Sequence, residues 1–163
     1  MILENNNTKQ IYFKAYQHLF ELDNALKYLK KEYSSNFQVS ILGKTNQFYQ
    51  DKNIEISKDV TIIKAHWKNL LGNNVNFGSF YNPQIGTIFI AGPLVTIFLH
   101  KVNNKPLAAL SSGSYGIFRG IGASEIETKT CLKLLYTGNF LLIFRGFENE
   151  LFILDNLLNA YVM

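Results

Sequence analysis

Two apolar runs that contain no charged residue constrain the fold of this chain more than any other feature. Residues 85–91 and 140–144 are rich in β-branched and aromatic side chains, which favour β-strands. Neither run has a charged face that water could solvate, so each is expected to be an interior strand that is covered on both sides. The rest of the chain must therefore supply the elements that cover a sheet.

The first third of the sequence predicts a βαβ unit. Residues 11–16 have the composition of a strand, and from Leu19 to Tyr33 apolar residues recur at spacings of three and four, which indicates a helix. Residues 37–42 alternate apolar and polar side chains, which predicts a half-buried strand that ends at Gly43. A right-handed crossover in such a unit would set the two strands parallel in one sheet.

The next stretch is less regular. Residues 44–56 are polar and without a period, so we expect a surface excursion there. A helix over 54–72 is predicted, with Ser57 as its cap and Gly72 at its end. Residues 73–82 are rich in turn formers and are expected to be irregular or β.

Glycines and prolines divide the region that follows the first uncharged run. Gly92 and Pro93 predict a passage from the strand into a short helix that extends to about Val102. Gly116 and Gly120 are four residues apart, so on a helix they would share one face and let another backbone approach closely. If that segment is not helical, the same glycines make a loop.

The last part of the chain predicts a helix, a strand and a helix. Ser124 and Glu127 match the capping-box pattern, and Gly138 lies where this helix would end. The second uncharged run, residues 140–144, follows as a strand. Residues 148–162 carry a leucine stripe that predicts a C-terminal helix.

Without the two insertions at 44–84 and 93–122, the expected elements have the order of a ferredoxin-like α+β sandwich (βαβ…βαβ), with additional helices in the middle and at the C-terminus. The length favours a single domain over 1–163, in which 1–9 would be a flexible lead-in. The helices of that frame cover one face of the sheet. Cover for the other face is expected from the 54–72 helix, the C-terminal helix or a dimer partner.

Composition narrows the classes of function. Lys and Arg number 16 against 12 Asp and Glu, and the excess forms no basic stripe, so we expect no nucleic-acid partner. The single cysteine, Cys131, excludes an intramolecular disulfide and a multi-cysteine metal site. The first ten residues do not have the pattern of a signal peptide, and the uncharged stretch 85–99 is shorter than the roughly 20 residues that span a bilayer. We therefore expect a cytoplasmic protein.

No group of residues in the sequence indicates a particular reaction. His18, His66 and His100 are far apart, and none has a second metal-type ligand at helical spacing. The segment from Gly120 to Gly122 begins like a dinucleotide-binding fingerprint but lacks its third glycine, which favours close backbone packing. We therefore predict no catalytic residue, no metal site and no cofactor.

The two arginines are the best candidates for binding an anion. Arg119 lies among the glycines and Arg145 at the end of an interior strand, and the guanidinium fork of either could hold an anionic group. A structural salt bridge to a glutamate is the favoured alternative for both. Arg119, Arg145 and His100 are the candidate ligand-binding residues.

Two motifs are distinctive: the turn Ala91-Gly92-Pro93-Leu94, and Gly120-Ile121-Gly122 with the capping box that follows it. Together with the opening strand and helix and with residues 38–43, they resemble the bacterial general-stress-protein-like domains, which carry a glycine-rich apolar insertion in a ferredoxin-like frame. The resemblance covers about two-thirds of the chain. It implies the fold and a loose association with stress, and it supplies no catalytic residue.

The leading hypothesis is a non-enzymatic α+β module that self-associates as a homodimer and binds a small molecule or a protein. One alternative is a peripheral membrane protein that docks through 85–122, where apolar residues lie beside lysines; a membrane surface is the less favoured partner. The other is an enzyme, because ferredoxin-like frames also host chemistry. An enzyme would have a pocket lined by at least two convergent polar groups, with Arg119, Arg145 or His100 among them.

Overall fold

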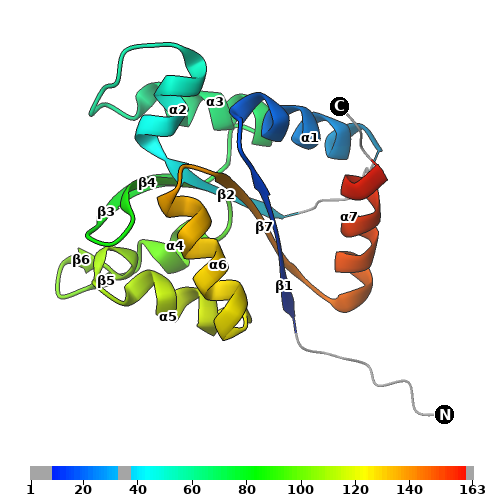
Figure 1. Cartoon of the computed structure of the whole chain (residues 1–163). Helices are drawn as coiled ribbons and strands as arrows, with labels where there is room; N and C mark the ends of the chain where they lie inside the picture. The colour runs from blue at the N-terminus through cyan, green and yellow to red at the C-terminus, as the bar shows by residue number, and fades with distance from the viewer. Residues whose placement is uncertain (1–8, 33–37, 161–163) are drawn as a thin grey trace.

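The structure is a computed structural model that describes residues 9–32 and 38–160. Its centre is an antiparallel five-stranded sheet with the order β1-β7-β2-β4-β3 (Figure 1). The strands are β1 (Gln10–Tyr16), β2 (Val39–Lys44), β3 (Phe77–Asn82), β4 (Gly86–Ala91) and β7 (Phe140–Gly146). β1 and β2 run parallel to each other with β7 between them, as expected of the βαβ unit.

Helices of the same chain cover both faces of this sheet. One face carries α1 (Leu19–Glu32), α2 (Thr45–Lys52), α3 (Thr61–Leu71) and α7 (Glu148–Ala160). The other carries α4 (Val95–Phe98), the 3₁₀ turn η1 (Leu107–Ala109), α5 (Gly113–Gly120) and α6 (Glu125–Tyr136). Figure 1 shows the two layers on opposite sides of the strands.

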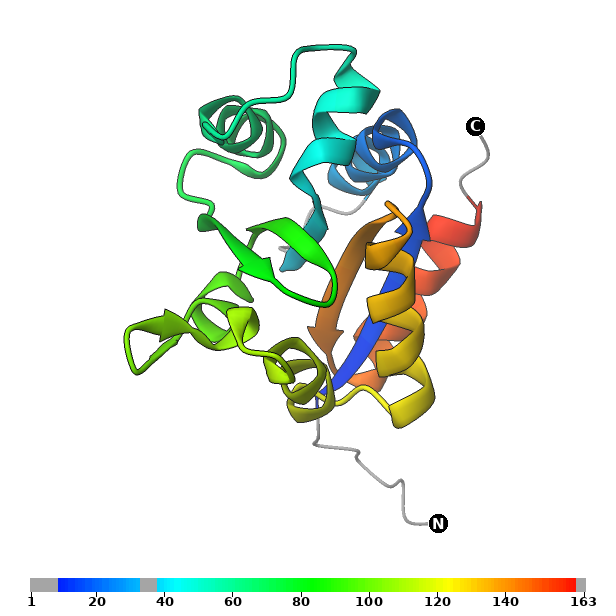
Figure 2. The ribbon, with the colours of Figure 1, turned by 60° about the vertical axis from the view of Figure 1, so that its left-hand side comes forward.

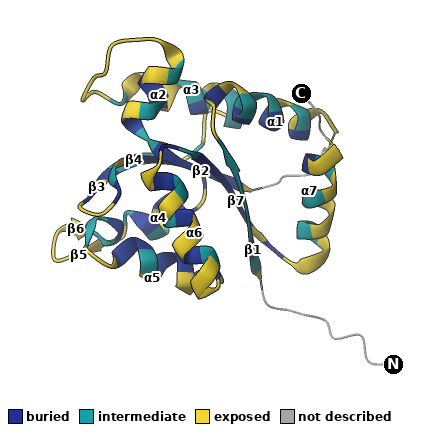
Figure 3. Ribbon diagram, in the orientation of Figure 1, coloured by how far each residue is buried: buried dark blue, intermediate teal, exposed yellow. Residues whose placement is uncertain are grey.

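The alternation of side chains along β7 explains why two cores form. Leu141 and Ile143 point into the core under α5 and α6, and Phe140, Leu142 and Phe144 point into the core under α1 and α7. All five side chains are buried, which appears in Figure 3 as the dark centre of the sheet. An uncharged strand is what two such faces require.

The α+β class predicted from the sequence is confirmed, and the structure is consistent with a ferredoxin-like fold. Two features extend that frame: β3 is a fifth strand at the edge, and each face has its own helices. The expectation that the two helices of the frame share one face was wrong, because α1 packs on one face and α6 on the other. The 54–72 region and the C-terminal helix lie on the same face as α1, and the middle helices cover the other face.

The two uncharged runs are interior strands, as predicted, but they are not neighbours. β2 lies between β4 and β7 and pairs with both. The prediction of a half-buried strand ending at Gly43 was wrong, because residues 39–43 are all buried and the strand continues to Lys44. The polar residue Ser40 is tolerated inside because its hydroxyl accepts a hydrogen bond from the Leu94 amide at 3.0 Å.

Residues 44–56 are not a surface excursion, since they contain helix α2. Its two turns place Phe48 and Tyr49 in the core, and a helix this short has no second apolar turn that would reveal a period. The predicted cap Ser57 does not cap α3, which begins at Thr61. The Asp59 carboxylate accepts from the Thr61 amide at 2.9 Å instead, and the predicted end at Gly72 is confirmed.

The segment after α4 turns back as a small hairpin, where the sequence predicted helix as far as Val102. β5 (Lys101–Val102) and β6 (Lys105–Pro106) pair around Asn103 and Asn104, whose φ angles of 52° and 64° suit a tight hairpin turn. Figure 2 shows this hairpin standing out from the layer that contains α4 and α5. Of the two alternatives for residues 73–82, irregular or β, the structure has the second, because residues 77–82 form β3.

The signals at the end of the chain are confirmed. Ser124 and Glu127 form a complete capping box at the start of α6, and Gly138, with φ of 93°, follows that helix. The leucine stripe of α7 buries Leu154 and Leu158. Residues 1–8, Tyr33 to Phe37 and the last three residues, on which some predictions fall, lie outside the described part of the chain.

Candidate functional site: an apolar groove beside α5

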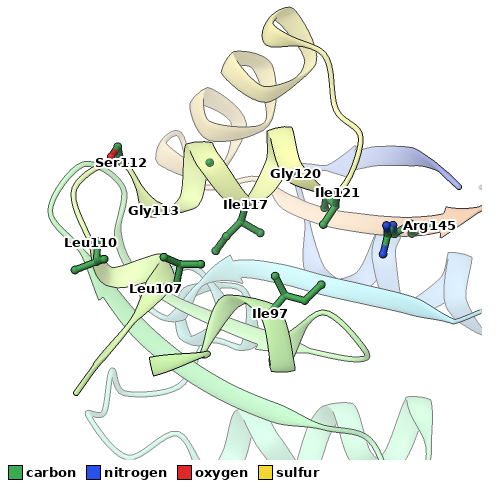
Figure 4. Close-up of a pocket in the computed structure, with 10 residues that line it drawn as sticks. Ile97, Leu107, Leu110, Ser112, Gly113, Ile117, Gly120, Ile121 and Arg145 are labelled. Carbon is green, nitrogen blue, oxygen red and sulfur yellow. The ribbon is translucent and has the colours of Figure 1, made fainter. Parts of the chain in front are cut away.

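A groove of about 490 Å³ runs between α5 and the α4–η1 segment, within the range of about 300–1,000 Å³ typical of small-molecule sites. We call it the α5 groove. It is lined by Ile97, Leu107, Leu110, Ser112, Gly113, Gly116, Ile117, Gly120, Ile121 and Arg145. Figure 4 shows Leu110 and Ser112 at one end, the isoleucines along its length, and Arg145 at the other end.

Two of the glycines in α5 leave one side of the groove without side chains. A Cβ atom added at Gly116 or Gly120 would meet no atom within 4 Å beyond its chain neighbours and the backbone of α5 itself. Glycine inside a helix costs about 1 kcal/mol relative to alanine, and no close packing at these positions offsets that cost. The predicted approach of another backbone to this face is therefore wrong, and the face is open.

Gly113 has a different role at the start of the same helix. A Cβ atom there would lie 1.7 Å from the carbonyl oxygen of Leu107, a distance no real contact reaches. The glycine lets the first turn of α5 pack directly on η1. Gly113 is thus structural, because it allows close packing, whereas Gly116 leaves open space beside the helix.

A buried asparagine fixes the opposite wall of the groove. Asn82, at the end of β3, donates from Nδ2 to the carbonyl oxygens of Ala108 at 2.8 Å and Leu110 at 3.1 Å. Its Oδ1 accepts from the amides of Gln84 at 2.8 Å and Ile85 at 3.3 Å. With 1% of its surface exposed, Asn82 uses its whole amide to tie η1 to the sheet. The groove is therefore preformed.

Arg145 supplies the positive charge at one end of the groove. It follows Leu141 and Ile143 on the same face of β7, but it lies beyond the covering helices and is exposed. Among the described residues, no carboxylate lies within ion-pair distance of its guanidinium, and no side-chain hydrogen bond engages it. The salt bridge to a glutamate that was the favoured expectation for Arg145 is therefore not formed among the described residues.

A smaller hollow of about 120 Å³ continues from the Arg145 end. Ile97 and Arg145 line both spaces, so the two adjoin at these residues. The smaller one adds the polar and cationic groups of Lys9, Gln38 and Ser40. No acidic residue lines either space. The site therefore has an apolar body and one cationic end.

The other two candidate binding residues lie outside the groove. His100 is exposed after α4, where its carbonyl oxygen accepts from the Leu107 amide at 2.7 Å. Arg119 is exposed on α5 and lies near Glu125. Lys129 first, and Arg119 to a smaller extent, hold the pKa of Glu125 below its usual range. Of the three candidates, only Arg145 lines the groove.

The described residues contain no arrangement suited to covalent or metal chemistry. Burial raises the pKa of the Cys131 thiol to about 12, so it is protonated and unreactive at neutral pH. His66 pairs with Asp23 at 2.9 Å and packs its ring on Phe48 and Trp67, which is a packing role. In the described ranges, no three His, Cys, Asp or Glu side chains are grouped to hold a metal ion.

No family model, curated protein or solved structure matches this chain. We therefore infer the role of the site from its own geometry. None of the helices in residues 9–32 and 38–160 is long and apolar enough to cross a membrane.

A second hollow, of about 650 Å³, lies at the start of β2 and is rich in amides. Its lining includes Asn73, Asn74, Asn76 and Gln38 and contains no charged side chain. With no charged group to orient a ligand, this hollow gives no defined site, and the α5 groove is the stronger candidate.

Sequence reasoning missed the groove because it arises between segments that were assigned separately. The spacing of Gly116 and Gly120 is the available signal, but the same spacing predicts a packing face. Nothing in the sequence shows whether a bare helical face meets a backbone or open space. Leu107, Leu110 and Ile117 have ordinary core composition, so only their placement around α5 identifies them as a lining.

Proposed function

We propose that this protein is a non-enzymatic binding module that holds a small apolar molecule in the α5 groove. The observation that carries the proposal is the bare face of α5. Two helical glycines that reduce stability and make no close contact keep a preformed apolar space open. A binding role accounts for this arrangement, because a ligand supplies the missing contacts.

The polar groups around the groove support binding over catalysis. Ser112 and Arg145 lie at opposite ends (Figure 4), so they do not converge on one point as an acid–base pair must. The Ser114 hydroxyl nearby donates to the Ala108 carbonyl oxygen at 3.0 Å and is committed to the structure. An enzyme at this site would lack a positioned nucleophile or base among the described residues.

Docking on a membrane through 85–122 has less support. Most large apolar side chains of that segment, among them Phe98, Ile117 and Phe118, are buried against the sheet. Of the exposed large hydrophobic side chains, Val102 is the one that lies in this segment. We expect that vesicles containing anionic lipid will not sediment the protein.

Binding of a neutral environment-sensitive dye such as Nile red tests the proposal. Gly116→Leu places an isobutyl group in the groove and is expected to weaken dye binding by about tenfold, since the lost apolar contact area is that of one side chain. Thr130→Leu adds the same group to the exposed surface of α6 and should leave binding unchanged. Equal affinity for the two variants would contradict the proposal.

Self-association is a second part of the proposal, and α7 offers a surface for it. Phe152 is 67% exposed and Ile153 39% exposed on the outer side of this helix, and Phe147 is 39% exposed just before it. Exposed apolar clusters of this kind mark protein contacts. Light scattering should report a dimer that Phe152→Ser shifts toward monomer. A monomer at every concentration for the wild-type chain would refute this part.

We further propose a kinship with the general-stress-protein-like domains and a cytoplasmic location. The proposed kinship rests on the two sequence motifs that carry the resemblance; in the structure, Gly120 and Ile121 of these motifs line the groove, and Pro93 and Leu94 line the adjoining hollow. The free buried thiol of Cys131 fits a reducing compartment. Raised transcript levels under stress, compared with unstressed growth, would support the kinship, and unchanged levels would count against it.

A further inference from the structure

We propose that the ligand of the α5 groove is a single-chain alkyl carboxylate, that is, a fatty acid, with its carboxylate at Arg145 and its chain along α5. This assignment rests on the function proposed above and names its ligand class. It follows from four features: the separation of charge from apolar surface, the sign of that charge, the length and volume of the groove, and the kind of cation at its end.

The separation of charge from apolar surface points to an amphiphile. Arg145 lies at one end of the groove and Ile97 and Ile121 adjoin it, whereas the remaining length is lined by Leu107, Leu110, Ile117 and bare helix backbone. A uniformly apolar ligand would gain nothing from an arginine at the mouth. A ligand with one charged end fills the groove and meets the cation at the same time.

The sign of the charge follows from what lines the site. Arg145 has no ion-pair partner among the described residues, and the linings of the groove and the adjoining hollow contain no acidic side chain. Lys9 adds a second positive charge to the hollow. A cationic head group would be repelled here, and an anionic one is attracted by both side chains.

The dimensions favour one alkyl chain of medium length. The groove follows α5, whose eight residues span about 12 Å at a rise of about 1.5 Å per residue. A volume of about 490 Å³ accommodates a single extended chain of that length. We therefore expect octanoate, decanoate and dodecanoate to be the best ligands of a homologous series.

The donors at the mouth favour a carboxylate over a phosphate. Arg145 presents one planar fork, which matches the two oxygens of a carboxylate. The Lys9 ammonium lies 5.9 Å from the centroid of the Phe147 ring, within the range of a cation–π contact, so it contributes charge without forming a second fork. A phosphate monoester with nearly two charges needs more donors than this mouth presents.

Calorimetric titration of the full chain with decanoate, decanol, decyl phosphate and decyltrimethylammonium, all below their micelle concentrations, tests the assignment. Decanoate is expected to bind at least tenfold more tightly than decanol, and the cationic amphiphile to bind most weakly. Arg145→Gln should weaken decanoate by about tenfold and leave decanol unchanged. Arg119→Gln removes the same charge from the exposed side of α5 and should change neither.

The outcomes separate the two proposals. If no alkyl compound binds, or if Gly116→Leu binds them as well as the wild type does, the proposed function fails. If decanol binds as tightly as decanoate and Arg145→Gln changes nothing, the groove binds apolar molecules but the fatty-acid assignment is overturned. Tighter binding of decyl phosphate than of decanoate would also overturn it, in favour of a phosphorylated amphiphile.

Discussion

Replacing the two open glycines of α5 by alanine should stabilise the protein. Gly116 lies in the middle of the helix and Gly120 at its last position. Their conformations are helical, and an added methyl group meets nothing within 4 Å at either site. The substitution therefore gains helix propensity without a clash.

The magnitude follows from helix propensity. Alanine is favoured over glycine by about 1 kcal/mol inside a helix, and we expect about half of that at Gly120 because it ends the helix. The double variant should therefore gain about 1.5 kcal/mol in the free energy of unfolding. With a urea m-value of about 2 kcal/mol/M, the midpoint should rise by about 0.7 M.

Urea denaturation followed by circular dichroism and by Trp67 fluorescence measures this change. Trp67 is the one tryptophan of the chain and is fully buried, so its emission reports the core, and coincident transitions would justify a two-state fit. Gly113→Ala is the matched control, which should lose about 2 kcal/mol because its methyl group would overlap the Leu107 carbonyl. A loss of stability for Gly116→Ala would refute the interpretation of the face as open.

Substitutions at three further positions test the packing of the structure and the pH dependence of its stability. Asn82→Ala should lower the free energy of unfolding by about 3 kcal/mol in urea denaturation, since it leaves buried backbone groups without partners. Asn82→Asp should also destabilise the protein, because a carboxylate cannot donate to the carbonyl oxygens of Ala108 and Leu110. A neutral effect of either substitution would contradict the role of Asn82 in tying η1 to the sheet. Ser124→Ala should cost about 1 kcal/mol through loss of the capping box, and an unchanged urea midpoint would argue against the cap. Burial, and then the charge of Glu127, raise the pKa of Cys131 from 9.0 to about 12. The unfolded thiol therefore ionises first, and stability is complete below pH 9 and falls by about 1.4 kcal/mol per pH unit as the pH rises toward 12. Cys131→Ala should reduce the loss between pH 8 and 10, and an identical pH dependence in the variant would show that the thiol is not responsible.

The sequence predicted the elements whose signals are local. The capping box at Ser124 and the stripe that begins at Leu19 depend on neighbouring residues, and both lie where they were expected. The uncharged runs correctly indicated interior strands, because a strand with two buried faces cannot carry charge.

Features that depend on distant partners were not predictable in the same way. Phe48 in α2 packs against His66 of α3 and Phe89 of β4, both of which are distant from it in sequence. The order of the strands places β2 between the two uncharged strands, and no local pattern specifies this order. The groove likewise depends on how η1 is tied to Asn82 across the fold, which left Arg145 as the one site residue that the sequence suggested.

We propose above that the α5 groove binds an alkyl ligand. NMR spectra of the isoleucine methyl groups test this binding most directly. Decanoate titrated into protein labelled at isoleucine methyl groups should shift the signals of Ile97, Ile117 and Ile121, which line the groove. The signal of Ile63, buried in the core on the other face of the sheet, should stay in place. Shifts at Ile63 with none at the three groove isoleucines would contradict the account.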